Sequence, residues 1–121
     1  MVSTNFVNRQ TINNPQFNKT IAIIIAIENY TQRENQVPSV KYAMNDASRF
    51  KKMLISSIGV DQKDIHEYKN EEALKSTLEY EFKNLFHSLT ENDRLIFYYV
   101  GHGFHDGVTN YLSTYDMHPY N

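Results

Sequence analysis

His102 stands between two glycines, directly after an apolar run over residues 95–100. A short apolar run of this kind predicts a β-strand, so the imidazole is expected at the carboxyl end of that strand. Open α/β sheets bind their ligands and hold their reactive groups at this edge. Because an imidazole has an ordinary pKa of about 6.5, it can take up and release protons near neutral pH. The pattern therefore predicts acid–base chemistry at His102.

Two alternatives stand beside that prediction. His105 and Asp106 follow in the same segment, and with His102 they offer ligands for zinc or iron, as in a small metal-dependent hydrolase. Their spacing matches no established ligand set, however, and no further His, Asp or Glu cluster completes one. We therefore expect no metal here and solvated side chains at His105 and Asp106. The other alternative is a turn histidine bonded to a neighbouring carbonyl group.

Three apolar segments are predicted to form the strands that position His102. Residues 20–27 are a continuous, mostly β-branched run without alternation, which is typical of a central parallel strand covered on both faces. Residues 64–69 predict a weaker strand, and residues 95–100 a third. After them we expect a flexible turn over residues 101–108 and a short return strand over residues 109–112.

Two helices are predicted between these strands. Ala43, Ala47, Phe50 and Leu54 form one apolar helical stripe, and Gly59 stands where that helix would stop. Asn70, followed by two glutamates, predicts the N-cap of a second helix, whose apolar stripe over residues 74–89 is expected in the core.

The order of the elements predicts an α/β fold with a mostly parallel sheet and helices on both faces. Residues 1–19 are rich in Asn, Gln and Thr and are expected to form a leader or edge extension, followed by one domain over residues 20–121. Three strands leave two sheet edges to protect, so we expect only the N-terminal portion of the complete fold.

Composition excludes several classes of protein. The 121 residues include 12 basic and 14 acidic side chains without a basic cluster, which argues against nucleic-acid binding. The longest apolar run, residues 21–27, is too short to cross a membrane and lies too far from the N-terminus for a signal peptide. The chain has no cysteine and hence no disulfide, so a cytoplasmic protein is expected.

Four segments occur in a recognisable order along residues 20–116. They are Ala26-Ile27-Glu28-Asn29-Tyr30, Asn45-Asp46-Ala47, the stretch from Asp93 to Gly103 with Tyr98-Tyr99 before Gly-His-Gly, and the stretch from Tyr111 to Asp116. In this order and spacing the chain resembles the N-terminal, large-subunit half of the caspase-like cysteine proteases. The resemblance is closer to metacaspases and their bacterial relatives than to animal caspases.

The resemblance implies a role for four residues. His102 would be the catalytic histidine, which exchanges a proton with a cysteine thiol and then with the leaving amine. Gly103 would supply a backbone N–H to the oxyanion hole. Asp46 would line an acidic pocket for an Arg or Lys side chain of the substrate, and Asp116 would belong to the same wall. Capping of the first helix is the alternative role for Asp46.

Three departures from the family pattern matter. Because no cysteine is present, the nucleophile is expected beyond Asn121 or in another polypeptide, and this chain alone is expected to be inactive. Val100 replaces the small polar residue that often precedes Gly-His-Gly, a change that would narrow or dry the substrate pocket. The arginine that gives animal caspases their aspartate specificity has no counterpart near residues 41–46, so cleavage after a basic residue is favoured.

The resemblance therefore implies a cysteine-type endopeptidase that acts on a peptide or protein substrate together with a Cys-containing remainder of the domain. The alternative is a catalytically dead pseudo-protease that binds peptides or serves as a regulatory module. No cofactor is expected. Activation by calcium, proteolysis or a signalling partner stays open, since the calcium sites of the family match no segment of this chain.

Overall fold

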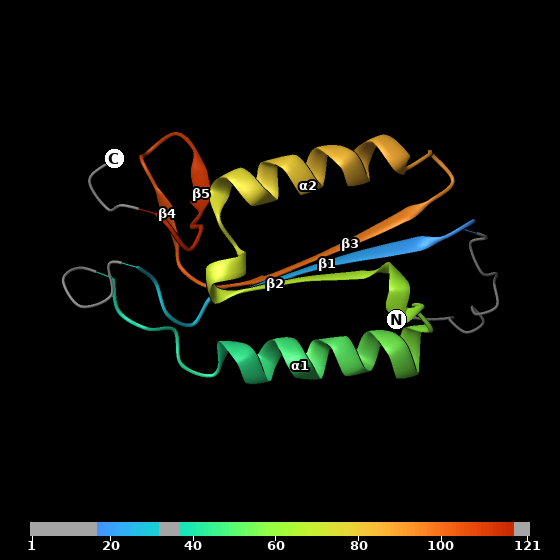
Figure 1. Cartoon of the computed structure of the whole chain (residues 1–121), viewed down its shortest axis with the longest axis horizontal. Helices are drawn as coiled ribbons and strands as arrows, with labels where there is room; N and C mark the ends of the chain where they lie inside the picture. Colours follow the sequence, from blue (N-terminus) through green and yellow to red (C-terminus); the bar gives the residue numbers. More distant parts are fainter. Residues whose placement is uncertain (1–16, 32–36, 118–121) are drawn as a thin grey trace.

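A computed structural model describes residues 17–31 and 37–117 of the chain. Strand β1 (Thr20–Ala26) lies between β2 (Ile65–Lys69) and β3 (Arg94–Val100), and both pairings are parallel. Helix α1 (Ala43–Met53) covers one face of this sheet and α2 (Lys75–Ser88) covers the other (Figure 1). The predicted α/β class and parallel sheet are therefore confirmed. The expected leader over residues 1–19 lies mostly outside the described residues.

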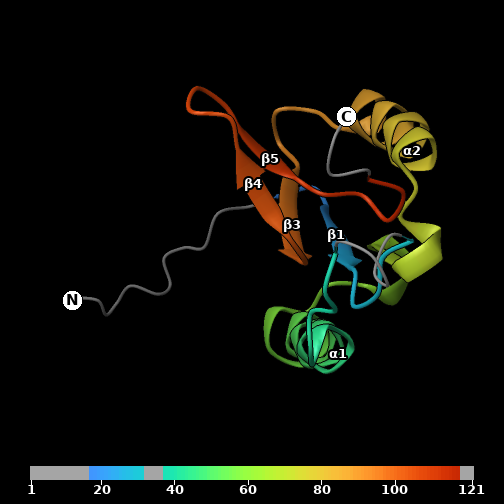
Figure 2. The same cartoon turned by 90° about the vertical axis from the view of Figure 1, so that its left-hand side faces the viewer.

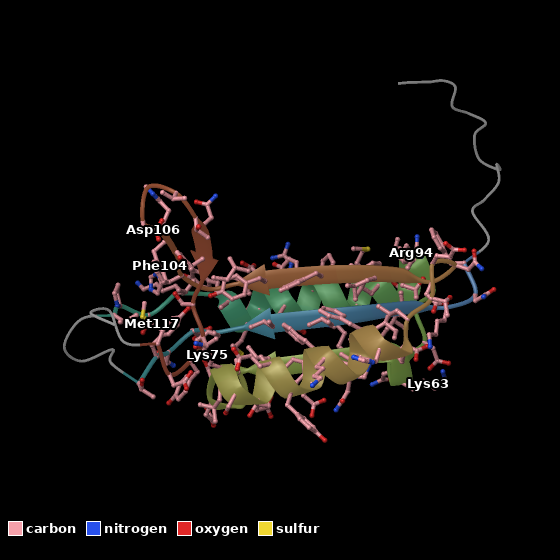
Figure 3. The ribbon with its side chains drawn as sticks, turned by 90° about the horizontal axis from the view of Figure 1, so that it is seen from above. Lys63, Lys75, Arg94, Phe104, Asp106 and Met117 are labelled. Atoms are coloured by element: carbon pink, nitrogen blue, oxygen red, sulfur yellow. The ribbon has the colours of Figure 1, made fainter. Side chains whose placement is uncertain are left out.

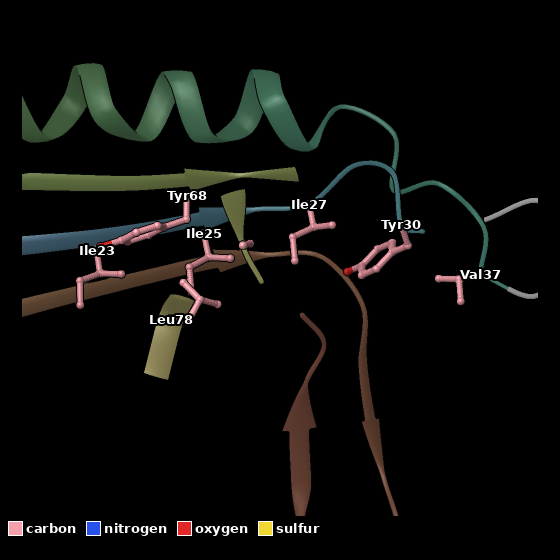
Figure 4. Packing of buried hydrophobic residues seen from close by; sticks show 8 residues of the cluster. Ile23, Ile25, Ile27, Tyr30, Val37, Tyr68 and Leu78 are labelled. Atoms are coloured by element: carbon pink, nitrogen blue, oxygen red, sulfur yellow. The ribbon is translucent and has the colours of Figure 1, made fainter. Parts of the chain in front are cut away.

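The core has two halves, one on each face of β1. Ile23 and Ile25 pack with Leu78 and Tyr68 on the α2 face (Figure 4), and Ile24 packs with Leu54 on the α1 face. Because successive side chains of a strand point to opposite faces, a strand covered on both sides must be apolar throughout. The prediction of a central buried strand is confirmed.

The end of α1 follows the predicted pattern. Beyond Met53 the chain continues as a π-helical turn over Leu54–Ile58 and ends at Gly59. Gly59 has φ 84°, in the left-handed region that glycine adopts without steric cost. The predicted stop of the helix at Gly59 is confirmed.

The predicted start of the second helix is wrong. Asn70 begins a short 3-10 turn (Asn70–Glu72), and α2 starts only at Lys75. Asn70 Oδ1 instead accepts hydrogen bonds from the backbone N–H groups of Glu28 at 2.9 Å and Asn29 at 3.1 Å. The local signal failed because these two amides, just past the end of β1, offered the asparagine partners that are remote in the sequence.

The predicted flexible turn after β3 is also wrong. Strand β4 (Gly103–His105) pairs antiparallel with β5 (Asn110–Leu112), so most of the segment is a hairpin. Figures 1 and 2 show this hairpin at the carboxyl edge of the sheet, on the same side as α2. Asp106 closes its turn by accepting the N–H groups of Val108 at 2.9 Å and Thr109 at 2.8 Å. The predicted return strand is confirmed as β5.

Part of the apolar stripe on α2 is not core. Leu78 is buried, but Phe86 is 49% exposed, and on β3 Leu95 and Phe97 are 39% and 45% exposed. We call these three exposed side chains, Phe86, Leu95 and Phe97, the α2–β3 surface. Within the described residues β3 is an outer strand of the sheet, which explains why its side chains on this face are incompletely covered.

None of the helices in the described part of the chain combines the length and the apolar character needed to cross a bilayer.

Candidate functional site

The imidazole of His102 is oriented by a carbonyl group that is remote in the sequence. Its Nε2 lies 2.7 Å from the carbonyl oxygen of Pro38, 64 positions earlier in the chain. A carbonyl oxygen only accepts hydrogen bonds, so Nε2 carries the proton and Nδ1 of the neutral ring keeps its lone pair. The residue is half-buried. The alternative expected a bond to a neighbouring carbonyl group, whereas the observed partner is remote in the sequence, and the bond fixes the tautomer that leaves Nδ1 unprotonated.

Two tyrosine hydroxyls hold the backbone of His102. Its N–H donates to Tyr30 Oη at 2.7 Å, and its carbonyl oxygen accepts from Tyr99 Oη at 2.8 Å. The same carbonyl oxygen accepts from the N–H of Ser113 at 2.9 Å. Both polar groups of the peptide backbone at His102 are thus satisfied by partners on other elements.

Sequence reasoning missed this role of Tyr30 and Tyr99, because aromatic side chains in and beside apolar strands are ordinarily assigned to packing. Packing is part of the answer, because Tyr99 joins the core half on the α2 face and Tyr98 joins the other half, as expected for neighbours in a strand. The two hydroxyls lie 3.4 Å apart although the residues are 69 positions apart. No local spacing signals such a contact.

Gly101 is required by the approach of these hydroxyls. A Cβ atom at this position would lie 2.6 Å from Tyr99 Oη and 2.7 Å from Tyr30 Oη, distances that real Cβ atoms do not adopt. Burial raises the pKa of Tyr99 far above its ordinary value. Tyr99 therefore stays protonated and keeps the hydrogen that it donates to His102.

Gly103 directly follows the histidine and begins β4, where it pairs with Leu112. A Cβ atom there would lie 3.4 Å from the carbonyl oxygen of Tyr111, so the position is tighter than most but not closed to a methyl group. The residue is exposed, which leaves its backbone accessible beside the imidazole.

Asp46 lies in the first turn of α1 and is exposed. It does not cap the helix, the alternative role considered for it: the cap position is Tyr42, and the N–H of Met44 donates to Glu28 Oε1 at 3.2 Å. Asp46 follows Asn45, which lines an open cavity of about 330 Å³ at the start of α1. This end of α1 lies at the carboxyl edge of the sheet, as does the chain that leaves β3 toward His102 (Figure 1).

Asp116 has a structural task. Its Oδ1 accepts from the N–H of Lys75 at 3.1 Å, at the first residue of α2, and from Thr114 Oγ1 at 2.9 Å. A carboxylate at this place satisfies a free amide and faces the positive end of the helix dipole. Asp46 and Asp116 thus lie at the N-termini of two helices that cover opposite faces of the sheet.

No cluster of metal-ligating side chains in the described part of the chain supports the alternative of a metal site. Among residues 17–31 and 37–117, no group of three or more His, Cys, Asp or Glu side chains is arranged to hold a metal ion. Asp106 Oδ2 accepts from Tyr111 Oη at 3.1 Å, while Oδ1 closes the hairpin turn. Figure 3 shows Asp106 and Phe104 on the hairpin at one end of the molecule, with Lys63 and Arg94 at the other.

A parallel sheet with one helix layer on each face and a histidine just beyond its carboxyl edge is the arrangement of a caspase-like α/β domain. A profile of the metacaspase peptidase C14 domain matches residues 20–119, and the chain therefore belongs to this family of peptidases. All the strands and helices described above lie within the matched range. No curated protein sequence matches the chain.

Proposed function

We propose that this chain is the histidine-bearing part of a caspase-like cysteine endopeptidase and that His102 is its general acid and base. The observation that carries the proposal is the 2.7 Å contact of His102 Nε2 with the Pro38 carbonyl oxygen. With its proton fixed on Nε2, the neutral ring offers Nδ1 as the base to a thiol. The same carbonyl oxygen would stabilise the imidazolium after proton transfer.

The proposed reaction begins when the thiol transfers its proton to Nδ1 of His102 and the thiolate attacks the peptide carbonyl carbon. A carbon–sulfur bond forms, and the negative charge moves to the carbonyl oxygen, where the N–H of Gly103 would donate a hydrogen bond. The imidazolium then protonates the amine nitrogen as the carbon–nitrogen bond breaks. Water, deprotonated by His102, hydrolyses the thioester and returns the thiol.

The nucleophile must come from outside these residues, because the chain contains no cysteine. Among the described elements β3 is an outer strand, and its residues Leu95 and Phe97 are 39% and 45% exposed. A further strand paired in parallel with β3 would protect this edge, and its carboxyl end would lie beside His102. We therefore place the cysteine at the end of such a strand, in a segment or polypeptide that completes the domain.

Asp46 would give the enzyme its preference for a basic residue at the cleaved bond. An exposed carboxylate at the carboxyl edge of the sheet is accessible to an Arg or Lys side chain of the substrate. Since hydrogen bonds to charged groups contribute about 1.5–3 kcal/mol, Asp46→Asn should lower kcat/KM for such substrates by roughly 10- to 100-fold. Asp116 would act on the same substrates only if its carboxylate serves both the substrate and α2.

The test is made on the full-length product of the gene, purified from its native cell. Fluorogenic peptides with Arg or Lys before the scissile bond are expected to be cleaved, and His102→Ala should lower kcat by roughly 100- to 10,000-fold. His87→Ala, an exposed histidine near the end of α2, is the matched control and should leave cleavage unchanged. Equal activity of the His102 variant and the control would refute the assignment.

The intact mass of the same product separates the two functions that the family allows. A species heavier than 14.2 kDa that contains cysteine, or a Cys-containing partner that purifies with the chain, is expected for the protease. A lone 14.2 kDa species that binds basic peptides saturably without cleaving them would instead establish the pseudo-protease, a binding module on the same scaffold.

A further inference from the structure

We propose that Tyr30 and Tyr99 are positioning residues for His102: their hydroxyls fix its backbone so that its imidazole reaches the Pro38 carbonyl. The inference rests on the proposed role of His102 as acid and base. It assigns to the buried Tyr30 and the half-buried Tyr99 a task that their packing in the core does not require.

Each hydroxyl of the pair bonds to a different backbone group of His102. Tyr30 Oη accepts the N–H of His102 at 2.7 Å, and Tyr99 Oη donates to the His102 carbonyl oxygen at 2.8 Å. Each hydroxyl has one hydrogen, and Tyr99 shares its own between His102 and the Ser113 carbonyl oxygen, also at 2.8 Å. The hydrogen of Tyr30 is then left for Tyr99 Oη at 3.4 Å. The donor and the acceptor of each hydrogen bond in this network are therefore assigned: Tyr30 donates to Tyr99, and Tyr99 donates to the two carbonyl oxygens.

The segment that carries Tyr30 also carries the acceptor of the imidazole. Tyr30 and Pro38 both belong to the connection between β1 and α1, and Tyr30 is fully buried. Two hydrogen bonds join the beginning of that connection to its end. The N–H of Val40 donates to the Glu28 carbonyl oxygen at 2.8 Å, and Ser39 Oγ donates to Asn29 Oδ1 at 2.8 Å. One connection therefore holds His102 at two points, its N–H through Tyr30 and its Nε2 through Pro38.

The ring of Tyr30 adds a packing contact to the hydrogen bond. Its centroid lies 5.1 Å from that of the His102 ring, with 39° between the planes. Figure 4 shows the oxygen of Tyr30 directed toward the chain that leaves β3. A Cβ atom at Gly101 would collide with both hydroxyls, so the glycine before His102 leaves the space that this pair of tyrosines occupies.

The hairpin also bonds to the backbone of His102. Ser113, which follows β5, donates its N–H to the His102 carbonyl oxygen at 2.9 Å and accepts from Tyr99. Three elements (the connection after β1, strand β3 and the end of the hairpin) thus meet at the backbone of His102. A loss of either hydroxyl should release the imidazole from Pro38 without removing any atom of the catalytic residue itself.

The first test reads the imidazole directly and needs no activity. In the full-length protein labelled with ¹⁵N-histidine, and with the His102 signal assigned by His102→Ala, we expect one Nε2–H tautomer and a slowly exchanging ring proton. Tyr99→Phe and Tyr30→Phe should each give a mixture of tautomers and exchange about tenfold faster, as for the loss of one hydrogen bond. Tyr68→Phe is the matched control, because Tyr68 lies in the same core half and its hydroxyl contacts Glu81 at 3.5 Å.

The tautomer separates positioning from general stability, since all three variants lose one hydroxyl from the same core. Unchanged tautomer and exchange in whichever of the two Tyr→Phe variants folds would overturn the inference. In the active protease the same variants should lower kcat with little change in KM, whereas Tyr68→Phe should not. If the imidazole responds but the wild-type protein cleaves no peptide, the proposed function fails and the positioning stands. If peptides are cleaved but the imidazole does not respond, only the positioning fails.

Discussion

At Gly101, a single hydrogen in place of a side chain decides whether His102 can be held. Two hydroxyl oxygens occupy the volume that a methyl group would take, at 2.6 and 2.7 Å from the Cβ position. The backbone at Gly101 does not have a positive φ, so the requirement is one of space and not of conformation. The glycines of the Gly-His-Gly segment consequently have different roles.

Gly101→Ala should lower the free energy of unfolding by about 1–3 kcal/mol, because the added methyl must displace the tyrosine pair. Gly103→Ala is the control, since its Cβ would meet only the Tyr111 carbonyl oxygen at 3.4 Å. Urea denaturation followed by circular dichroism measures both. Equal losses of unfolding free energy in the two variants would show that the two hydroxyls move aside at little cost and that a glycine is not required at position 101.

Asp116 can be tested for its two roles with two substitutions. Asp116→Ala removes the acceptor at Lys75 N and should cost about 1 kcal/mol of stability, as for other lost helix caps. Asp116→Asn keeps a side-chain oxygen as the acceptor and removes the charge, so most of that stability should remain. Denaturation midpoints check this expectation. Reduced cleavage of Arg and Lys peptides by Asp116→Asn, at unchanged stability, would reveal a second role in the substrate pocket.

At the scale of elements, the hairpin after β3 depends on one carboxylate. Hydrogen bonds from the N–H groups of Thr109 and Val108 and from the Tyr111 hydroxyl hold the pKa of Asp106 below its ordinary value. A lowered pKa means that this stabilisation is fully present above the ordinary value of 3.8 and is lost as the pH falls through the lower folded value. The hairpin is therefore expected to loosen in acid before the sheet does.

Hydrogen exchange of the amides of residues 103–112 measures this loosening. Protection in the wild type should fall as the pH drops below about 4, while amides of β1 stay protected. Asp106→Ala should show the loosened hairpin already at neutral pH. Asp106→Asn retains an acceptor for the two amides and should keep intermediate protection without the acid transition. Unaltered hairpin protection in Asp106→Ala would mean that strand pairing alone holds β4 and β5 together.

At the scale of the whole molecule, the two faces of the sheet differ in how well they are covered. On the outer strand β3, Ile96 and Tyr98 of the α1 face are half-buried, whereas Leu95 and Phe97 of the α2–β3 surface are 39% and 45% exposed. An apolar cavity of about 210 Å³ opens beside it, lined in part by Phe82, Phe97 and Leu112. An exposed apolar surface of this kind next to an outer strand favours association with another segment.

Phe97→Glu should weaken self-association of the isolated chain and its binding to the Cys-bearing remainder of the domain. Its effect on unfolding should stay near 0.5 kcal/mol, because nearly half of this residue is exposed to solvent. Leu54→Ala, from the buried face, is the contrasting variant and should cost about 2–5 kcal/mol while leaving association unchanged. Sedimentation and denaturation measure the two effects. A large loss of stability in Phe97→Glu would place this side chain in the core after all.

Much of the fold could be predicted because its signals are local. The apolar run of β1, the helical stripe of α1 with Gly59 at its end, and the position of His102 after β3 depend on residues close together in the sequence. Predictions failed where a local signal competed with a remote partner. Asn70 was expected to cap its own helix, but it bonds to the amides of Glu28 and Asn29, 42 and 41 positions away.

The sequence by itself determined that a parallel α/β sheet would present a histidine at its carboxyl edge, since periodicity and strand ends are properties of neighbouring residues. Only the tertiary structure decided what holds that histidine. Its ring partner, Pro38, and its backbone partner, Tyr30, lie 64 and 72 positions away. Hydrogen bonds form between groups that folding brings within about 3 Å, and no spacing along the chain specifies which groups those are.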